Sequence, residues 1–169
     1  YVGPTFLQGV EYSHGWNPAQ PPATDNSEPY LLRGNRTIGN WVGFRLDGSY
    51  DPLYRSGLNA STADNAQGIN LYDGVYDGVI TGNYIASVYD GIQLQSPNSG
   101  GHLVRDNVIG VSPTGQPAPL TRWGIVVRWG TENHNLEANT IRNAALGGIG
   151  LLDTNARGQA TSVAYRIRM

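Results

Sequence analysis

The chain contains no cysteine and no lysine. Without cysteine, a disulfide framework and the Cys-based zinc sites are excluded. No apolar run reaches the roughly 18 residues that a membrane-spanning helix needs, so we expect no membrane insertion. The formal net charge is −2, which provides no general attraction to nucleic acid or to an anionic bilayer. We therefore expect neither nucleic acid nor a membrane as partner.

Charged residues are also scarce, at 14% against the roughly 25% usual for soluble domains. Phenylalanine occurs twice and methionine once, whereas glycine occurs 23 times in 169 residues. Glycine, asparagine, aspartate and β-branched residues favour strands and turns over helices. A chain of this length is typical of one domain with a sizeable core.

Asparagine recurs inside short β-rich runs at a nearly fixed period. The spacings are 24, 24, 24 and 32 residues for the series Asn35, Asn59, Asn83, Asn107 and Asn139. The last interval contains the turn-rich segment 112–119, so an insertion at one corner of a regular coil explains it. Asparagine tolerates the left-handed conformation of a sharp turn, and stacked amides can hydrogen-bond from one coil to the next. We interpret this column as structural.

A second column, with the pattern Gly-apolar-x-apolar, runs in phase with the first. Its members are Gly43–Leu46, Gly68–Leu71, Gly91–Leu94, Gly124–Val127 and Gly148–Leu151. Gly9–Tyr12 resembles an earlier member, separated from the rest by a Pro-rich loop over 16–29. Alternation with period two predicts strands whose apolar residues face one side.

Stacked coils of this kind form a right-handed parallel β-helix, an all-β solenoid of about six coils with a period near 24 residues. A single 24-residue unit cannot bury its apolar face, whereas stacked units can. The expected core ladders are Phe44, Ile69, Ile92, Ile125 and Ile149; Leu46, Leu71, Leu94, Val127 and Leu151; and Leu32, Ile80, Val104 and Leu136. One domain is expected over 1–169, with an irregular coil over 1–30, regular coils over 30–155 and a terminal strand in 156–169.

The alternation of Asn-x-Ile and Gly-Ile-x-Leu at about 24 residues resembles the right-handed parallel β-helix repeats of the pectate-lyase-like superfamily. The resemblance covers residues 30 to 155 and implies architecture rather than activity, because that superfamily includes lyases, glycosidases, epimerases, surface proteins and phage tail proteins. It implies an extracellular, cell-surface or virion-associated location. It also implies that the outward face of the sheet formed by the Gly-apolar-x-apolar strands can line a polysaccharide-binding groove.

Outward positions of that sheet carry amides, arginines and aromatic rings. Amides and arginine bond sugar hydroxyls and carboxylates, and aromatic rings stack on sugar rings. The candidate glycan-binding residues are Glu11, Asn70, Tyr72, Gln93, Gln95 and Trp129. We expect a polysaccharide-binding module.

A lyase or glycoside hydrolase acting in the same groove is the alternative. A glycosidase needs two carboxylates at a defined separation, and the catalytic candidates are Asp47, Asp73, Arg45 and Arg128. The signatures of polygalacturonases and of mannuronan epimerases are both missing: Asp51-Pro52 is followed by leucine. No catalytic set is therefore assigned, and a structural stalk or filament segment remains a second alternative.

No metal or other cofactor is expected, with Ca²⁺ left open because a lyase would use it. The Tyr-Asp-Gly triplets at Asp73, Asp77 and Asp90 are typical of turns. The three histidines lack metal-ligand spacing, and we expect them near turns as surface or local hydrogen-bonding groups.

The ends of the coil carry no predicted cap. Residues 1–30 show no amphipathic helix, and 162–169 resembles a strand that stops. Open strand edges invite pairing with another strand. We therefore expect end-to-end contact with further coils of a longer chain or with neighbouring subunits.

Overall fold

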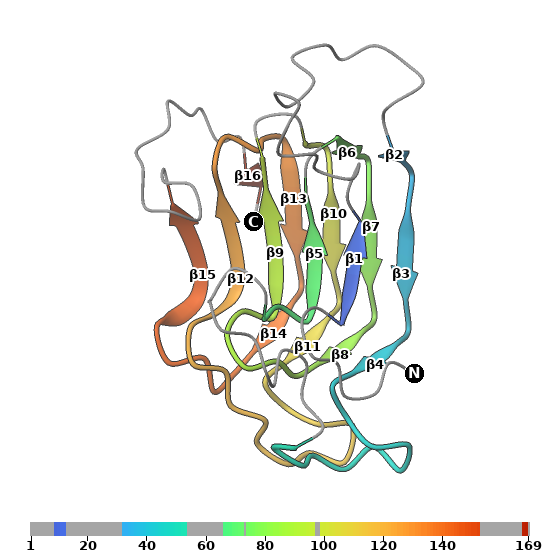
Figure 1. Ribbon diagram of the computed structural model, residues 1–169, viewed down its shortest axis with the longest axis vertical. Coiled ribbons are helices and arrows are strands. Elements are labelled where there is room, and N and C mark those ends of the chain that lie inside the picture. Colours follow the sequence, from blue (N-terminus) through green and yellow to red (C-terminus); the bar gives the residue numbers. More distant parts are fainter. Residues whose placement is uncertain are drawn as a thin grey trace, which may run out of the picture.

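The computed structural model describes residues 9–12, 32–53, 66–72, 74–96, 99–152 and 167–168. This part of the chain is a parallel β-solenoid, with strands that stack in register along one axis (Figure 1). Within the described ranges, no helix is long and apolar enough to cross a membrane. The all-β class and the stacked architecture expected from the two repeat columns are confirmed.

Three sheets wrap around the core, and every strand pairing in them is parallel. Sheet 1 contains β1 (Val10–Tyr12), β5 (Ile69–Leu71), β9 (Ile92–Gln95), β12 (Trp123–Arg128) and β15 (Gly147–Leu152). Sheet 2 contains β3 (Arg36–Ile38), β7 (Val79–Thr81), β10 (Leu103–Arg105), β13 (His134–Glu137) and β16 (Ile167–Arg168). Sheet 3 contains β4 (Trp41–Val42), β8 (Tyr84–Ile85), β11 (Val108–Ile109) and β14 (Thr140–Ile141). The short strands β2 (Leu32–Arg33) and β6 (Val75–Tyr76) form a separate parallel pair.

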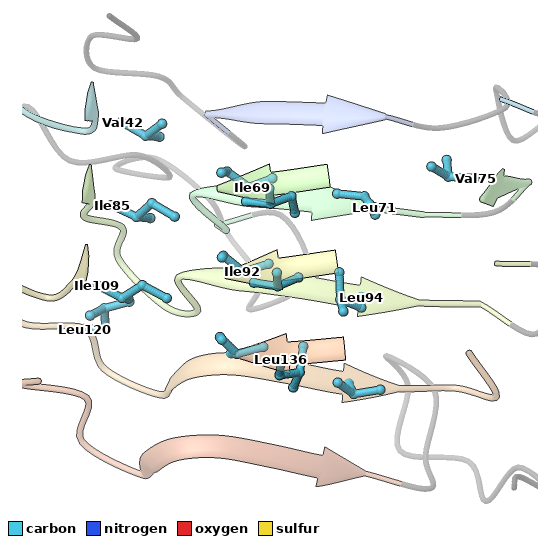
Figure 2. Packing of buried hydrophobic residues seen from close by; sticks show 14 residues of the cluster. Val42, Ile69, Leu71, Val75, Ile85, Ile92, Leu94, Ile109, Leu120 and Leu136 are labelled. Carbon is cyan, nitrogen blue, oxygen red and sulfur yellow. The ribbon is translucent and has the colours of Figure 1, made fainter. Parts of the chain in front are cut away.

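The core is a set of apolar ladders that run along the axis (Figure 2). Sheet 1 aligns Ile69, Ile92 and Ile125 in one ladder and places Leu71 beside Leu94 in the next. All five side chains are at most 1% exposed. Each strand thus buries its apolar residues only because the neighbouring coils supply the same residue type at the same height.

Glycine precedes each isoleucine of this ladder because a side chain would not fit there. A Cβ at Gly68, Gly91 or Gly124 would lie 2.7, 2.5 or 2.8 Å from the carbonyl oxygen of the corresponding glycine in the next coil. It would also lie 2.2–2.5 Å from an isoleucine Cγ2 of sheet 3. The glycine column therefore reflects close approach between coils and between sheets.

We expect Gly91→Ala to destabilise the fold by about 3 kcal/mol, since the added methyl group meets a backbone carbonyl that cannot move without shifting the next coil. Gly148→Ala is the matched control, because the nearest atom to its Cβ is Ile141 Cδ1 at 3.9 Å. Urea unfolding of the two variants measures the difference. Equal stabilities would contradict the packing described for this column.

The first coil differs from the expectation. β1 pairs directly with β5, so that Val10 lies beside Ile69 and Tyr12 beside Leu71. Membership of Gly9–Tyr12 in the column is confirmed, whereas placement of Gly43–Leu46 in sheet 1 is wrong. That segment follows β4 as a loop in which Leu46 is 75% exposed.

Two other residues predicted in the core ladders, Phe44 and Leu32, also lie elsewhere. Phe44 is buried, but in a separate small cluster with Ala86 and Ala118 rather than in the sheet 1 ladder. Leu32 lies in β2 and is 37% exposed, while Thr37 occupies the position beside Ile80 in sheet 2. Among the described residues, the largest sheets have five strands each, and the Gly43 segment contributes no strand to sheet 1.

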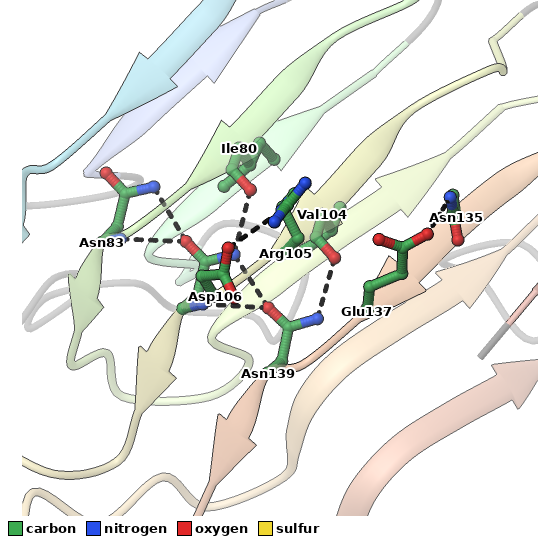
Figure 3. Close-up of polar contacts among 9 residues, drawn as sticks. Ile80, Asn83, Val104, Arg105, Asp106, Asn135, Glu137 and Asn139 are labelled. Atoms are coloured by element: carbon green, nitrogen blue, oxygen red, sulfur yellow. Dashed lines mark hydrogen bonds and ion pairs between the residues drawn. The ribbon is translucent and has the colours of Figure 1, made fainter.

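The asparagine column is a hydrogen-bonded ladder (Figure 3). Asn107 Oδ1 accepts from the backbone N and the Nδ2 of Asn83, at 3.0 and 2.9 Å. Asn139 Oδ1 accepts in the same way from Asn107, at 3.1 and 2.9 Å. Bonding from coil to coil is thus confirmed for these three residues.

Asn40, and not Asn35, is the first member of the column, because its backbone N donates to Asn83 Oδ1 at 2.9 Å. Asn59 lies outside the described residues. The left-handed residue at this corner is the one before each asparagine: Gly39, Gly82, Asp106 and Ala138 have φ between 51° and 67°. The asparagine therefore caps the turn with its side chain and does not supply the unusual backbone conformation itself.

Candidate functional site

A chain of polar side chains crosses the carboxyl ends of three neighbouring strands of sheet 1. Arg128 Nε, at the end of β12, donates to Gln95 Oε1 at 3.2 Å, and Gln95 Nε2 donates to Asn70 Oδ1 at 3.4 Å. All three residues are at most 5% exposed. Burial of an arginine requires such partners, because an uncompensated charge in the interior is costly. We call Asn70, Gln95 and Arg128 the polar relay.

Two aromatic rings lie beside the polar relay. Tyr72 follows β5 and Trp129 follows β12, and their ring centroids are 5.8 Å apart with an interplanar angle of 36°. Both residues are half-buried. We call this pair the aromatic patch. It brings together residues 57 positions apart because the stacked coils place the ends of β5 and β12 at the same edge of sheet 1.

Trp129 has a left-handed backbone conformation, with φ of 56°. A bulky residue in this region costs about 1–2 kcal/mol relative to glycine or asparagine, which adopt it readily. The neighbouring coil has the same requirement, since Ser96, beside Trp129 in the stack, has φ of 96°. A tryptophan thus occupies a position at which the turn favours glycine. Such strained positions concentrate at functional sites.

Two other glycan candidates lie outside the relay and the patch. Gln93 Oε1 accepts from Gln67 Nε2 at 3.2 Å, and both residues are fully buried. Glu11 is exposed on the end strand β1, where it is the register partner of Asn70. The expectation of a solvent-facing polar column therefore does not hold for Asn70, Gln93, Gln95 and Arg128, whose outward side chains are covered.

The three catalytic candidates that the structure describes, Arg45, Asp47 and Arg128, do not converge. Arg45 and Asp47 lie on the loop after β4, which is at the end of the molecule opposite to the carboxyl ends of the sheet 1 strands (Figure 1). Asp73 lies outside the described residues. Arg128 is part of the polar relay. The structure therefore does not place Arg45 and Asp47 in one groove with Arg128.

The charged side chains of that loop have partners within the loop itself. Arg45 forms an ion pair with Asp51, and Asp47 Oδ1 accepts from Ser49 Oγ and N at 2.6 and 2.9 Å. The bonds from Ser49 hold the pKa of the Asp47 carboxyl below its usual value. The backbone N–H of Leu53 lowers the pKa of Asp51 in the same way. These are properties of a tight turn and do not describe a general acid.

Two of the three aspartates interpreted as turn residues are described by the structure, and Asp73 is not. Asp77 is exposed with φ of 55° and forms an ion pair with Arg33 at 2.9 Å. Asp90 is buried, and its Oδ1 accepts from the backbone N of Trp123 at 3.0 Å. In the part of the chain that the structure describes, no three His, Asp or Glu side chains gather as metal ligands would.

Of the two alternatives for the histidines, a surface position is wrong for His102 and His134, whereas local hydrogen bonding holds, because each ring contacts a hydroxyl three residues earlier. His14 lies outside the described residues. His102 and His134 are buried, at 0% and 2% exposure, and their rings stack with centroids 4.9 Å apart and planes 9° apart. His102 immediately precedes β10 and His134 is the first residue of β13, so the two rings stack between neighbouring coils of sheet 2. Their separation of 32 residues equals that of Asn107 and Asn139, which is the signal in the sequence that could have revealed them.

Each imidazole is held at both nitrogens. Nδ1 of His102 accepts from the backbone N of Gly78 at 3.1 Å, and Nδ1 of His134 accepts from the backbone N of His102 at 3.3 Å. Nε2 lies 3.0 Å from Ser99 Oγ in the first and 2.9 Å from Thr131 Oγ1 in the second. With Nδ1 as acceptor, the neutral ring carries its proton on Nε2. Burial lowers the pKa of His102 to about 4, and burial together with His102 lowers the pKa of His134 to about 3.

No family model, curated protein or solved structure matches this chain. The fold and the side-chain geometry are therefore the basis for assigning a function.

Proposed function

We propose that this chain is a β-helix module that binds polysaccharide through the aromatic patch at the edge of sheet 1. The observation that supports the proposal most is the half-buried Tyr72–Trp129 pair, with rings 5.8 Å apart, at a position where Trp129 is conformationally costly. Aromatic faces that remain partly open stack on the apolar faces of sugar rings. As part of the same proposal, the module acts outside the cell or on a virion surface.

The polar relay connects the strand ends that carry the two rings of the aromatic patch. Arg128 immediately precedes Trp129, and its bond to Gln95 anchors the end of β12. Gln95 in turn bonds Asn70, two residues before Tyr72. Both rings are thus attached to strand ends that a buried hydrogen-bonded chain holds together, which reduces the entropy lost when a ligand orders them.

Calorimetric titration with a panel of neutral and acidic polysaccharides tests the proposal. We expect binding by the wild type, and a loss of at least about tenfold in affinity for Tyr72→Ala, a size typical of a buried aromatic contact. Tyr89→Ala is the matched control, because Tyr89 is also half-buried but lies before β9, at the opposite end of that strand.

The variant Trp129→Gly tests polysaccharide binding separately from folding. Glycine relieves the strained backbone, so we expect this variant to fold while it loses polysaccharide binding. Circular dichroism and the same titration provide the two readings. Absence of binding by the folded wild type across the panel, or unchanged affinity in Trp129→Gly and Tyr72→Ala, would rule out this site.

A further inference from the structure

Among the described strands, those at the two ends of the solenoid have one neighbour each. β1, β3 and β4 terminate the three sheets at one end, and β15, β16 and β14 terminate them at the other (Figure 1). All pairings between these ends are parallel, so the edges at both ends run in the same direction. A strand edge with its N–H and C=O groups unpaired is a template for another strand.

The last strand of sheet 1 exposes residues of the core type. Leu151 is 48% exposed, although its partners in the same ladder, Leu94 and Val127, are fully buried. Leu146, just before β15, is 57% exposed. These side chains match the interior pattern, but in the described part of the chain no further coil covers them.

The glycine column shows what that next coil would have to supply. Inside the stack, the space at each glycine Cβ position is occupied by the carbonyl oxygen of the following glycine, at 2.5–2.8 Å. At Gly148 the nearest atom of the described residues is 3.9 Å away, and none of their carbonyl oxygens lies within 4 Å. The first strand of the sheet begins with the same motif, since Gly9 precedes Val10 and Tyr12, both of which are half-buried.

We propose that copies of this chain stack head to tail, with β1 of one copy pairing in parallel with β15 of the next. This arrangement continues the register of the column: Gly9 follows Gly148, Val10 covers Ile149, and Tyr12 covers Leu151. Two β15 edges facing each other would instead run antiparallel and would not continue the column. A head-to-tail contact does not close on itself, so the assembly grows with concentration. The inference goes beyond the proposed polysaccharide binding and is independent of it.

Sedimentation velocity over a wide concentration range tests the proposal. We expect the wild type to grow past the dimer as concentration rises. Gly148→Ala should keep the stability of the single chain, because its methyl group has room, and should lose association, because that methyl group occupies the place of the incoming carbonyl. Thermal unfolding of dilute samples verifies that the variant is folded.

Two leucine variants provide a matched pair. Leu151→Glu places a charge on the proposed contact and should abolish growth, while Leu53→Glu changes a residue that is more exposed, at 67%, but lies on the loop after β4. Wild-type protein that stays monomeric at every concentration, or that stops at the dimer, would overturn the proposal. Association of Gly148→Ala equal to that of the wild type would overturn the proposed register.

Discussion

Asn107→Ala is expected to lower the free energy of unfolding by about 3–5 kcal/mol. The side chain is fully buried, and its Oδ1 and Nδ2 serve Asn83, Asn139 and the carbonyl oxygen of Ile80, the last at 3.0 Å. Alanine leaves the backbone N–H of Asn83 and the carbonyl of Ile80 without these bonds in the interior. Each buried unsatisfied group costs about 1–3 kcal/mol.

Asn40→Ala is the control for this prediction. Asn40 ends the ladder, is half-buried, and uses its Nδ2 for Ile38 O and Asn83 Oδ1 at 3.1 and 3.3 Å. We expect a cost of about 1 kcal/mol or less, since solvent can replace these bonds. Urea denaturation of both variants gives the comparison. A loss at Asn107 no larger than that at Asn40 would show that the ladder does not stabilise the coil cooperatively.

The second large effect is a loss of stability in mild acid, caused by the stacked histidines. The folded-state pKa values are about 4 for His102 and about 3 for His134, whereas an unfolded histidine has a pKa near 6.5. Between these values the unfolded chain binds protons that the folded chain excludes, so stability falls as pH falls through 6.5 and continues to fall to about 4. With about 1.36 kcal/mol per pH unit for each ring, the loss between pH 7 and pH 4.5 is about 5 kcal/mol.

Urea unfolding at a series of pH values measures this slope. The pKa values of Asp47 and Asp51 are also lowered, so their contribution to stability likewise falls with falling pH. Because an unfolded aspartate has a pKa near 3.9, that loss occurs mainly below the window between pH 7 and pH 4.5. Each of the variants His102→Gln and His134→Gln should lower by about one the number of protons that the unfolded chain binds in excess of the folded chain. A stability that is flat over this window, or a slope that both variants leave unchanged, would contradict burial of the neutral pair.

The interior coils were predictable from the sequence because two repeat columns agree there. Gly91–Leu94 and Gly124–Val127 share their phase with Asn83, Asn107 and Asn139, and the pairing of β9 with β12 follows that register. Repetition of one residue type at one height is what a stacked coil requires, so the pattern carries the register as well as the fold.

The first coil was not predictable in the same way. Asn35 precedes Asn59 by the same 24 residues that separate Asn83 from Asn107, yet it lies beside Gly78 and not in the asparagine ladder. Gly43–Leu46 also has the strand pattern, but it follows β4 as a loop. Asn40 and Asn83 are 43 residues apart, and one period cannot show where in such an interval the insertion falls.

The candidate site was predicted in part. The pattern grouped Tyr72, Gln95, Arg128 and Trp129 by their outward positions, and the structure brings these residues together at one edge of sheet 1. It did not show that Gln95 and Arg128 are buried, because outward direction from a sheet says nothing about what covers that face. The histidine pair has one signal in the sequence, because Ser99-x-x-His102 recurs as Thr131-x-x-His134 at the 32-residue interval.

The order of the coils can be tested most directly with paired cysteines, because the native chain has none. Glu11 and Asn70 are register partners of β1 and β5, at a separation in a parallel sheet that a disulfide can bridge. We predict that Glu11→Cys with Asn70→Cys forms the intramolecular disulfide on oxidation of the folded chain, as mass spectrometry of peptides would detect, and that Arg45→Cys with Asn70→Cys does not. Cross-linking of 45 to 70 without cross-linking of 11 to 70 would contradict the stack and restore the coil order that the repeat spacing alone implies.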